Sequence, residues 1–316
     1  MNASLTTSLL NAVGDDGSVE ANADLGSHTT FRVGGRAAWF VTATTFRCLQ
    51  EVLALLPPGL PRAILGNGSN VLVADAGFDG IVIHLSGEFD EISIDGTKVS
   101  AGAGADLPRV ARRSVEAGLS GFEWAVGVPG TIGGAVAMNA GGHGADMAAS
   151  LSFVRLIDGM TREERIATNE QLQLSYRSSN LRSTDVVLSV EINLHEGDRE
   201  AGRTRLHEIV AWRRANQPGG QNCGSVFTNP PKGPSAGALI DRCGLRGFRI
   251  GSAAVSEKHA NFIQADPGGT ASDVLEVIAT VATTVLAQRG VSLHTELRVL
   301  GNVPHLPDGL LSSVIR

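Results

Sequence analysis

Residues 126–144, with the sequence VGVPGTIGGAVAMNAGGHG, contain seven glycines in nineteen positions, in a chain with 39 glycines among 316 residues. Glycine loses more backbone entropy on folding than any other residue. A chain keeps such a density where its backbone turns sharply, or where another group must approach the backbone closely. This segment therefore predicts either a set of tight turns or a ligand-binding loop.

A second glycine cluster, LGNGSN at residues 65–70, lies between the apolar runs RAIL and VLVA. An Asn-Gly pair between apolar runs is a strong signal for a β-hairpin turn. The additional glycine, serine and asparagine also favour a concave nest of backbone amides that binds phosphate. Neither cluster matches the dinucleotide fingerprint G-x-G-x-x-G within a βαβ unit. Two such loops, about sixty residues apart, suggest a long cofactor with a diphosphate at its middle.

Composition excludes several classes of protein. With 42% hydrophobic and 18% charged residues, the chain has the composition of an ordinary globular protein, and its length predicts two or three domains. A net charge of −6 argues against a nucleic-acid partner. No apolar run reaches the length of a membrane span, and the N-terminus lacks the features of a signal peptide, so we expect a cytoplasmic chain that begins with a loosely ordered arm.

Metal sites are not indicated by the sequence. The three cysteines, Cys48, Cys223 and Cys243, are widely spaced and form no C-x-x-C pair, which indicates a reducing compartment and no structural zinc. The eight histidines include no H-x-x-x-H pair. We therefore expect no metal.

Hydrophobic periodicity predicts an α+β fold with mixed sheets. Short strands are expected within 31–95 and 151–195. Helices are expected over 45–56, over 107–117 with Asp106 as its cap, over 198–216, and over 270–289 between a Thr270 or Ser272 cap and Gly290. The alternation of apolar and polar residues over 291–299 predicts a further strand.

Six motifs carry a resemblance to a known family. In chain order they are TTFRVGGRA, LGNGSNVLVAD, GVPGTIGGAVAMNAG, LSYRSSNL, CGSVFTNP and AVSEKHANFI. Their order, over about residues 28–301, resembles that of the UDP-N-acetylenolpyruvoylglucosamine reductases of peptidoglycan precursor synthesis. The absence of an insertion after Tyr176 is similar to the short subclass that lacks a tyrosine-bearing lid loop.

The resemblance implies the activity and its partners. Members reduce the enolpyruvyl ether of UDP-N-acetylglucosamine enolpyruvate to UDP-N-acetylmuramate, with non-covalent FAD and with NADPH as hydride donor. The implied fold is α+β: a two-part FAD-binding region of the flavin-oxidase (PCMH) type, followed by a C-terminal α+β substrate-binding domain. The implied boundaries are an arm at 1–27, FAD-binding subdomains at 28–90 and 91–197, a substrate-binding domain at 198–302 and a tail at 303–316.

The resemblance also implies roles for individual residues. The catalytic residues would be Arg177 for the substrate carboxylate, Ser225 as proton donor, and Glu296. The residues implied in FAD binding are Gly66, Asn67, Gly68, Ser69, Asn70, Gly127, Pro129, Gly130, Thr131, Gly133, Gly134 and Asn139. The residues implied in substrate binding are Tyr176, Asn229, Lys258 and His259.

The sequence departs from the family at Thr228, where GSVFTNP has threonine in place of a lysine. One cation near the nucleotide phosphates is then missing, and Lys258 or the basic strip around Arg242 and Arg246 would have to replace it. Two rival functions stay open at this point: a sugar or hydroxy-acid oxidase on the same scaffold, and a non-catalytic flavin-binding relative.

Each candidate residue also has a plainer interpretation. Arg177 fits a surface arginine in a polar loop, and Ser225 fits a turn serine that bonds the backbone. Glu296 fits the solvated face of an edge strand. His259 fits a satisfied, half-buried histidine.

Overall fold

The computed structural model describes residues 2–303, 307, 309–311 and 313–315. They form two compact units, each assembled from segments that are far apart in the sequence. The first unit comprises Met1–Ala21, Trp39–Gly66 and Val82–Arg213, and the second comprises Asn22–Ala38, Asn67–Ile81 and Arg214–Arg316. The sequential division at residues 27, 90, 197 and 302 stays a prediction.

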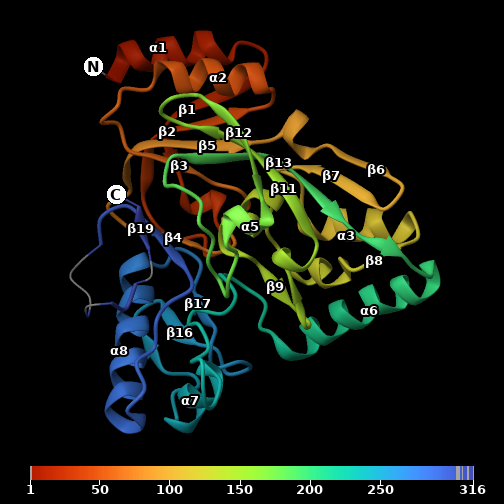
Figure 1. Cartoon of the computed structure of the whole chain (residues 1–316). Coiled ribbons are helices and arrows are strands. Elements are labelled where there is room, and N and C mark those ends of the chain that lie inside the picture. Colours follow the sequence, from red (N-terminus) through yellow and green to blue (C-terminus); the bar gives the residue numbers. More distant parts are fainter. Residues whose placement is uncertain (1, 304–306, 308, 312, 316) are drawn as a thin grey trace. The chain divides into compact units, whose positions relative to one another are not determined.

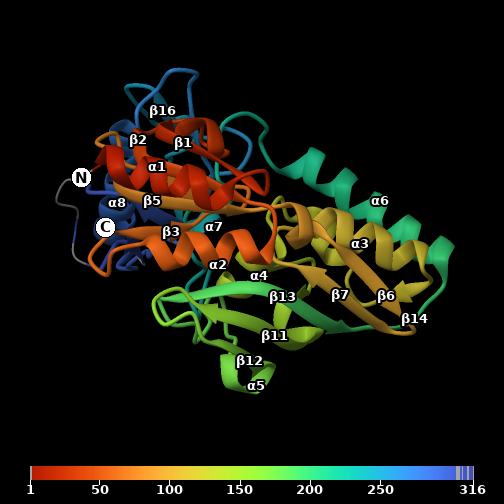
Figure 2. The same cartoon turned by 90° about the horizontal axis from the view of Figure 1, so that it is seen from above.

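A five-stranded antiparallel sheet lies in the first unit, in the order β12-β11-β13-β7-β6 (Figure 2). Its strands are β6 (Ile92–Asp95), β7 (Lys98–Gly102), β11 (Leu151–Asp158), β12 (Glu164–Thr168) and β13 (Asp185–Asn193). The apolar run VVLSV makes β13 the central strand, with most of its side chains buried. The strands expected in this region are confirmed.

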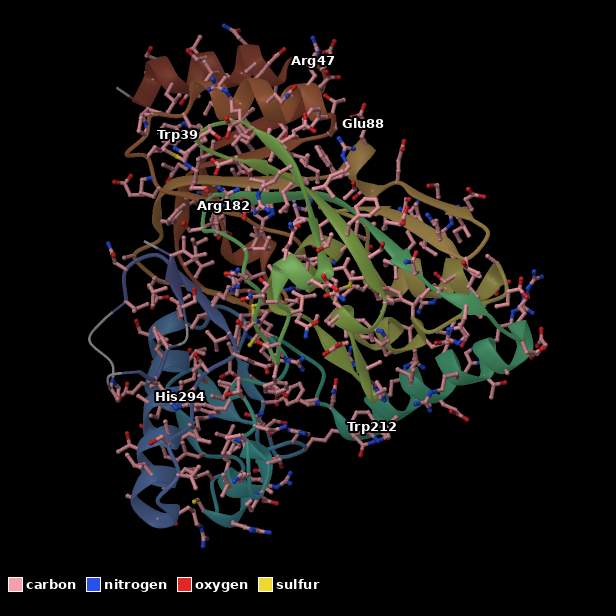
Figure 3. All side chains as sticks on the ribbon, in the orientation of Figure 1. Trp39, Arg47, Glu88, Arg182, Trp212 and His294 are labelled. Atoms are coloured by element: carbon pink, nitrogen blue, oxygen red, sulfur yellow. The ribbon has the colours of Figure 1, made fainter. Side chains whose placement is uncertain are left out.

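A four-stranded sheet has the order β1-β2-β5-β3. Its strands are β1 (Gly17–Asp24), β2 (Arg36–Ala43), β3 (Arg62–Ile64) and β5 (Phe78–Leu85). Helices α1 (Asn2–Val13) and α2 (Phe46–Leu55) pack against each other. The indole Nε1 of Trp39 donates to Thr6 of α1 at 2.9 Å (Figure 3). The predicted loose order of the N-terminal arm is therefore wrong, because α1 and β1 occupy most of it.

Three more helices belong to this part of the chain: α3 (Leu107–Glu116), α4 (Ile132–Met138) and α6 (Arg199–Asn216). Arg203 of α6 bonds both carboxylate oxygens of Glu116, and Figure 2 shows α6 running alongside α3. Asp106 occupies the N-cap position of α3 but makes no side-chain capping bond, which corrects its predicted role. The remaining short elements are β8 (Leu119–Ser120), β9 (Gly141–Gly142), β10 (Ala145–Asp146), β14 (His195–Glu196) and α5 (Asn169–Leu172), with 3-10 turns at Gly26–His28, Gly87–Asp90, Glu123–Gly127 and Met147–Ala149.

The described part of the second unit contains two three-stranded sheets and two helices, besides parts of β1, β2 and β5. One sheet is parallel, in the order β19-β18-β4, with β4 (Val71–Val73), β18 (Arg298–Leu300) and β19 (Val314–Ile315). The other is antiparallel, with β15 (Arg249–Ile250), β16 (Ala253–Val255) and β17 (Ile263–Ala265). Helix α7 (Ala236–Arg242) and helix α8 (Ala271–Arg289) complete the unit (Figure 1).

Helix α8 has the caps that the sequence predicts: the Thr270 hydroxyl accepts from the amide of Asp273, and Gly290 ends the helix in the left-handed conformation. By length and composition α8 could cross a membrane. Its apolar face is instead part of the buried core of the unit, where Val277, Ile278 and Val281 are fully buried together with Phe31, Leu72 and Phe227. We therefore assign α8 as a core helix.

The hairpin alternative for residues 65–70 is wrong, and the strand expected from residue 291 is confirmed only at its C-terminal end. Residues 65–70 do not close a hairpin, because β3 pairs with β5 in the four-stranded sheet, whereas β4 lies parallel to β18. Of residues 291–299, only Arg298 and Val299 belong to a strand, while the preceding segment is extended with a single bridge between Thr295 and Phe227. The alternating burial persists there nonetheless, with Leu293 and Leu297 buried and His294 exposed (Figure 3).

Candidate active site

At Gly68, in the loop of residues 65–70, the backbone conformation and the neighbouring backbone require a glycine. Its φ of +58° lies in the left-handed region, and a Cβ at this position would stand 2.3 Å from the carbonyl oxygen of His28. The Gly68 carbonyl also accepts the amide of Thr30 at 3.2 Å. This glycine is therefore explained by backbone packing within the second unit, with or without a ligand.

The two glycine-rich stretches meet in the first unit. A Cβ on Gly66 would lie 2.4 Å from the Thr131 hydroxyl oxygen. Thr131 is buried and caps α4, since its hydroxyl accepts from the amide of Gly134 at 3.4 Å. The amide of Gly133 donates to Ala103 at 2.8 Å. The amides of Gly133 and Gly134 are thus satisfied inside the protein.

Other amides of these loops are free. Within the described part of the chain, the backbone N–H groups of Gly66, Gly68, Ser69, Gly130 and Thr131 make no hydrogen bond. Gly68 and Thr131 are buried, and buried N–H groups in proteins are nearly always paired. A run of unpaired donors in glycine loops fits an anionic ligand such as a diphosphate. The residues present therefore fit a flavin dinucleotide.

The remaining predicted FAD residues have differing surroundings. Gly127 faces α6, where a Cβ would stand 3.0 Å from Ile209, so helix packing explains this glycine. Pro129 is exposed. Gly134 is exposed and open, since its nearest neighbour would be the Thr131 hydroxyl at 3.6 Å. A ligand can approach the backbone at Gly134, but not at Gly127.

Asn139 is buried at the C-terminal end of α4, in the left-handed conformation with φ of 39°. Its Nδ2 donates to Asp146 and to the Ser175 carbonyl, both at 3.0 Å, and its Oδ1 accepts the amide of Ala148 at 2.9 Å. Both the amide nitrogen and the amide oxygen of the side chain therefore make hydrogen bonds to protein groups.

Tyr176 and Arg177 form the tip of a tight turn. Ser175 and Ser178 exchange two backbone hydrogen bonds of 3.0 Å across it. The Arg177 guanidinium lies over the Tyr176 ring, 5.1 Å from its centroid, and donates to the Gly141 carbonyl at 3.2 Å. Tyr176 is 56% exposed. The turn therefore presents an aromatic ring and a cation together at the surface of the first unit.

Ser225 lies in an extended segment of the second unit. Gly224 precedes it with φ of +82° and donates to Asn222, and the amide of Val226 donates to Asn261 at 2.9 Å. The Ser225 hydroxyl is half-buried and bonds to no protein group among the residues described. This differs from the turn serine that the plainer interpretation expected, whose hydroxyl would bond the backbone.

Glu296 lies on the segment that runs antiparallel to that of Ser225. Its amide donates to Val226 at 2.8 Å, and its carbonyl accepts from the Asn70 side chain at 2.9 Å. The pKa of the Cys223 thiol is raised by burial and, further, by the nearby Glu296 carboxylate. Ser225, Glu296 and the Asn70 end of the glycine loop thus belong to one hydrogen-bonded framework.

The predicted substrate residues of the second unit already have protein contacts. The Asn229 side chain accepts the first amide of α7, from Ala236, at 3.0 Å. Lys258 is exposed and donates to the Arg214 carbonyl. His259 is half-buried against the Phe262 ring, with ring centroids 4.7 Å apart. Burial, and then the charge of Arg246, lower its pKa.

The cation missing at Thr228 has three candidate replacements, Arg242, Arg246 and Lys258, and all three are exposed. The Thr228 hydroxyl donates to the His294 carbonyl at 3.1 Å. Arg246 is bound to the Asp241 carboxylate and the Glu257 carbonyl. Arg246 and Lys258 thus both bind protein groups, and which cation replaces the lysine stays a prediction.

Asn261 was missed as a functional residue by sequence reasoning, although it stands in the quoted motif AVSEKHANFI. It is buried, its Oδ1 accepts from the Phe227 amide at 3.0 Å, and its Nδ2 donates to the Phe227 carbonyl at 2.8 Å. It therefore holds the segment that carries Ser225. The available signal was an asparagine between the apolar residues Ala260 and Phe262.

The predicted catalytic residues divide between the two units. Arg177 belongs to the first, together with Gly66, Gly130 and Thr131. Ser225 and Glu296 belong to the second, together with the loop residues from Asn67 onward.

Known proteins similar to this chain agree with both parts of the fold. Residues 37–165 match the model of an FAD binding domain, and residues 216–300 match that of the C-terminal domain of UDP-N-acetylenolpyruvoylglucosamine reductase. The reductase of Heliobacterium modesticaldum is 44% identical over 285 residues, covering 89% of this chain and 90% of the relative. That of Bacillus velezensis is 38% identical over 291 residues, covering 90% and 95%.

Solved structures extend the comparison. The UDP-N-acetylenolpyruvylglucosamine reductase of Thermus caldophilus has a TM-score of 0.76 and 36% identity, over 90% of this chain and 98% of that one. BBE-like 1 of Physcomitrella patens, at 12% identity and a TM-score of 0.57 over 88% of each chain, shares the fold alone. The predicted fold class, an FAD-binding region of the flavin-oxidase type followed by a C-terminal α+β domain, is confirmed. The chain belongs to the UDP-N-acetylenolpyruvoylglucosamine reductase family.

Proposed function

We propose that this chain reduces the enolpyruvyl ether of UDP-N-acetylglucosamine enolpyruvate to UDP-N-acetylmuramate in the cytoplasm, with FAD as cofactor and NADPH as hydride donor. Family membership over about nine-tenths of the chain supports this reaction above the two rivals. When bound, the flavin supplies hydride transfer between the nicotinamide and the enol ether. Its diphosphate would be held by the free amides of Gly66, Gly130 and Thr131, which all belong to the first unit.

Arg177 would bind the carboxylate of the enolpyruvyl group. A planar guanidinium donates two parallel hydrogen bonds to a carboxylate, and its charge offsets the negative charge that develops beside that carboxylate during reduction. The guanidinium is carried by a turn whose neighbouring Tyr176 is 56% exposed, and it donates to the Gly141 carbonyl at 3.2 Å. Tyr176 would orient the same group through the cation–π contact.

Ser225 would donate the proton that accompanies the hydride, so that one hydride and one proton add across the carbon–carbon double bond. A serine is a poor acid, and it can donate only as negative charge develops on the substrate. Its unengaged hydroxyl is the observation that carries this assignment. Glu296, on the paired segment, would share that proton or stabilise its donor. Asn229, Lys258 and His259 would contact the rest of the UDP sugar.

The test separates the two halves of the reaction. Flavin bleaching by NADPH requires no proton on the substrate carbon, whereas recolouring by the UDP sugar does. In Ser225→Ala we expect bleaching near the wild-type rate, and recolouring slower by about 10²–10⁴. Glu296→Gln should show the same one-sided defect. Stopped-flow absorbance of the flavin measures both halves.

The matched control is Ser292→Ala, which removes an exposed serine from the same chain segment as Glu296. It should leave both rates unchanged. If Ser225→Ala slows bleaching and recolouring equally, Ser225 belongs to the flavin site or to the fold, and the proton has another source.

A further inference from the structure

The turn that carries Arg177 has an unusual residue at its tip. Tyr176 and Arg177 are its two central residues, and of these Arg177 has a positive φ, +56°. A positive φ at the second central position of a tight turn strongly favours glycine or asparagine. An arginine persists there only if the surroundings hold it, and such backbone strain is typical of functional sites.

Asn139 supplies the main restraint. Its Nδ2 donates to the Ser175 carbonyl, which is the same oxygen that accepts the turn-closing amide of Ser178. The Ser175 carbonyl can only accept and the Ala148 amide can only donate, so the Asn139 side chain has one possible orientation. The second Nδ2 hydrogen goes to Asp146. Hydrogen bonds to Asp146, Ser175 and Ala148 therefore fix the Asn139 side chain, and the one to Ser175 restrains the turn.

The neighbouring residues of Asn139 contact the same turn. The Ser179 hydroxyl donates to the Ala137 carbonyl at 2.9 Å, and Arg177 itself donates to the Gly141 carbonyl. Residues 137–141, the end of the glycine-rich stretch, thus form the platform on which the Arg177 turn rests. Asn139 also adopts the left-handed conformation that ends α4, which asparagine tolerates better than most residues other than glycine.

We infer that Asn139 is a positioning residue for Arg177, rather than a flavin contact. It fixes the carbonyl that closes the turn, and so it fixes where the guanidinium meets the substrate carboxylate. This inference rests on the proposed role of Arg177. It also gives the last part of the glycine-rich stretch a substrate-side function that differs from that of Gly130 and Thr131.

The experiment is a double-mutant cycle on the holoenzyme. Asn139→Gly and Arg177→Gly each keep the backbone conformation, since glycine readily adopts positive φ, while removing the side chain. The readout is the dissociation constant of UDP-N-acetylglucosamine enolpyruvate, measured by calorimetry on the oxidised protein without NADPH. We expect Asn139→Gly to weaken binding about tenfold, because only one of the three side-chain hydrogen bonds that it removes, the one to Ser175, restrains the turn. In the Arg177→Gly background the same change should have almost no further effect.

The control is Asn169→Ala, which removes another asparagine hydrogen bond, to Ala148, without touching the turn. It should bind the UDP sugar normally. Flavin content and the rate of bleaching by NADPH should match the wild type in Asn139→Gly. If its effect multiplies fully with that of Arg177→Gly, or if flavin is lost, Asn139 acts on the fold or the cofactor and the inference is wrong. If Arg177→Gly alone binds the UDP sugar normally, the proposed role of Arg177 fails instead.

Discussion

Gly68 and Gly134 show that glycines in these loops are required for different reasons, one for backbone packing and the other for open space beside the backbone. Gly68 is closed in by the backbone of residues 28 and 29, whereas a side chain at Gly134 would meet only the Thr131 hydroxyl, at 3.6 Å. A larger residue at Gly68 therefore damages the fold before it reports on any ligand. Gly134 is the better probe of the cofactor, because leucine also favours a helix more than glycine does.

Gly134→Leu should remain folded and lose FAD. The control is Gly142→Leu, at a position where an added Cβ would have no heavy atom within 4 Å. The ratio of flavin to protein absorbance measures occupancy, and thermal unfolding by circular dichroism verifies the fold. Full flavin content in Gly134→Leu would contradict the assignment of this position to the FAD site.

Among the secondary-structure elements, helix positions were predicted well from local sequence signals, whereas the pairing of strands was not. Helices α2, α6 and α8 stand where their periodicity predicts, because capping and one-sided burial are local properties. The hairpin alternative for residues 65–70 is wrong because β4 pairs with β18, from the opposite end of the chain. No short-range pattern contains that information. The Asn70–Glu296 bond was hidden for the same reason.

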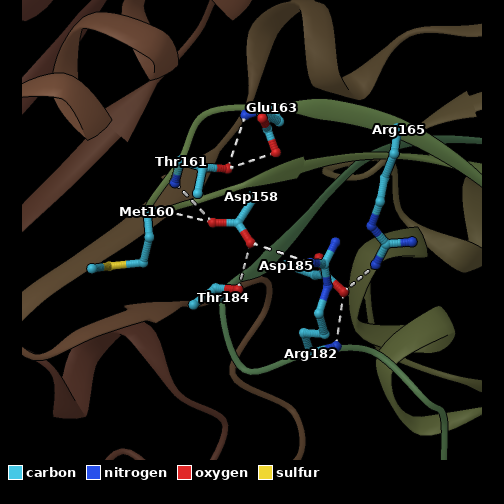
Figure 4. A network of polar contacts seen from close by, with 8 residues as sticks. All are labelled: Asp158, Met160, Thr161, Glu163, Arg165, Arg182, Thr184 and Asp185. Carbon is cyan, nitrogen blue, oxygen red and sulfur yellow. Dashed lines mark hydrogen bonds and ion pairs between the residues drawn. The ribbon is translucent and has the colours of Figure 1, made fainter.

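The turn after β11 provides a pH-dependent test of one element. The Asp158 carboxylate accepts from the amides of Met160 and Thr161 and from the Thr184 hydroxyl (Figure 4). These hydrogen bonds hold the pKa of Asp158 below its usual value, and the bond from the Thr161 amide has the largest effect. Because the pKa is lower in the folded state, the ionised carboxylate stabilises the fold fully at pH values above its ordinary pKa of about 4. This stabilisation is lost as the pH falls through the lowered pKa.

Asp158→Asn should therefore unfold more easily than wild type at neutral pH, by about 1.5–3 kcal/mol, the range for hydrogen bonds to a charged group. The deficit should shrink in acid, where the wild-type carboxyl becomes protonated. Denaturant unfolding across the pH range measures it. The exposed Asp79→Asn serves as control and should show no such deficit. A deficit that is independent of pH would show that the charge of Asp158 contributes nothing.

For the whole molecule, motif order was enough to predict the family, the cofactor class and the fold class, and the comparisons confirm these. The assembly of each unit from distant segments was not predictable, because hydrophobic patterns identify elements and leave their neighbours open. The glycine-rich stretch therefore looked like one ligand loop. In the structure its amides at Gly130 and Thr131 are free, its middle packs into the protein, and its end supports the turn of Arg177.

An anaerobic titration shows whether this chain reduces the enolpyruvyl sugar through bound flavin. Purified protein should be yellow and should release its flavin on acid denaturation. NADPH should bleach it, and UDP-N-acetylglucosamine enolpyruvate should restore the colour, with UDP-N-acetylmuramate formed in equal amount to the NADPH consumed. If the bleached protein recolours only with oxygen and leaves the UDP sugar unchanged, the protein is an oxidase or a silent relative, and the account is contradicted.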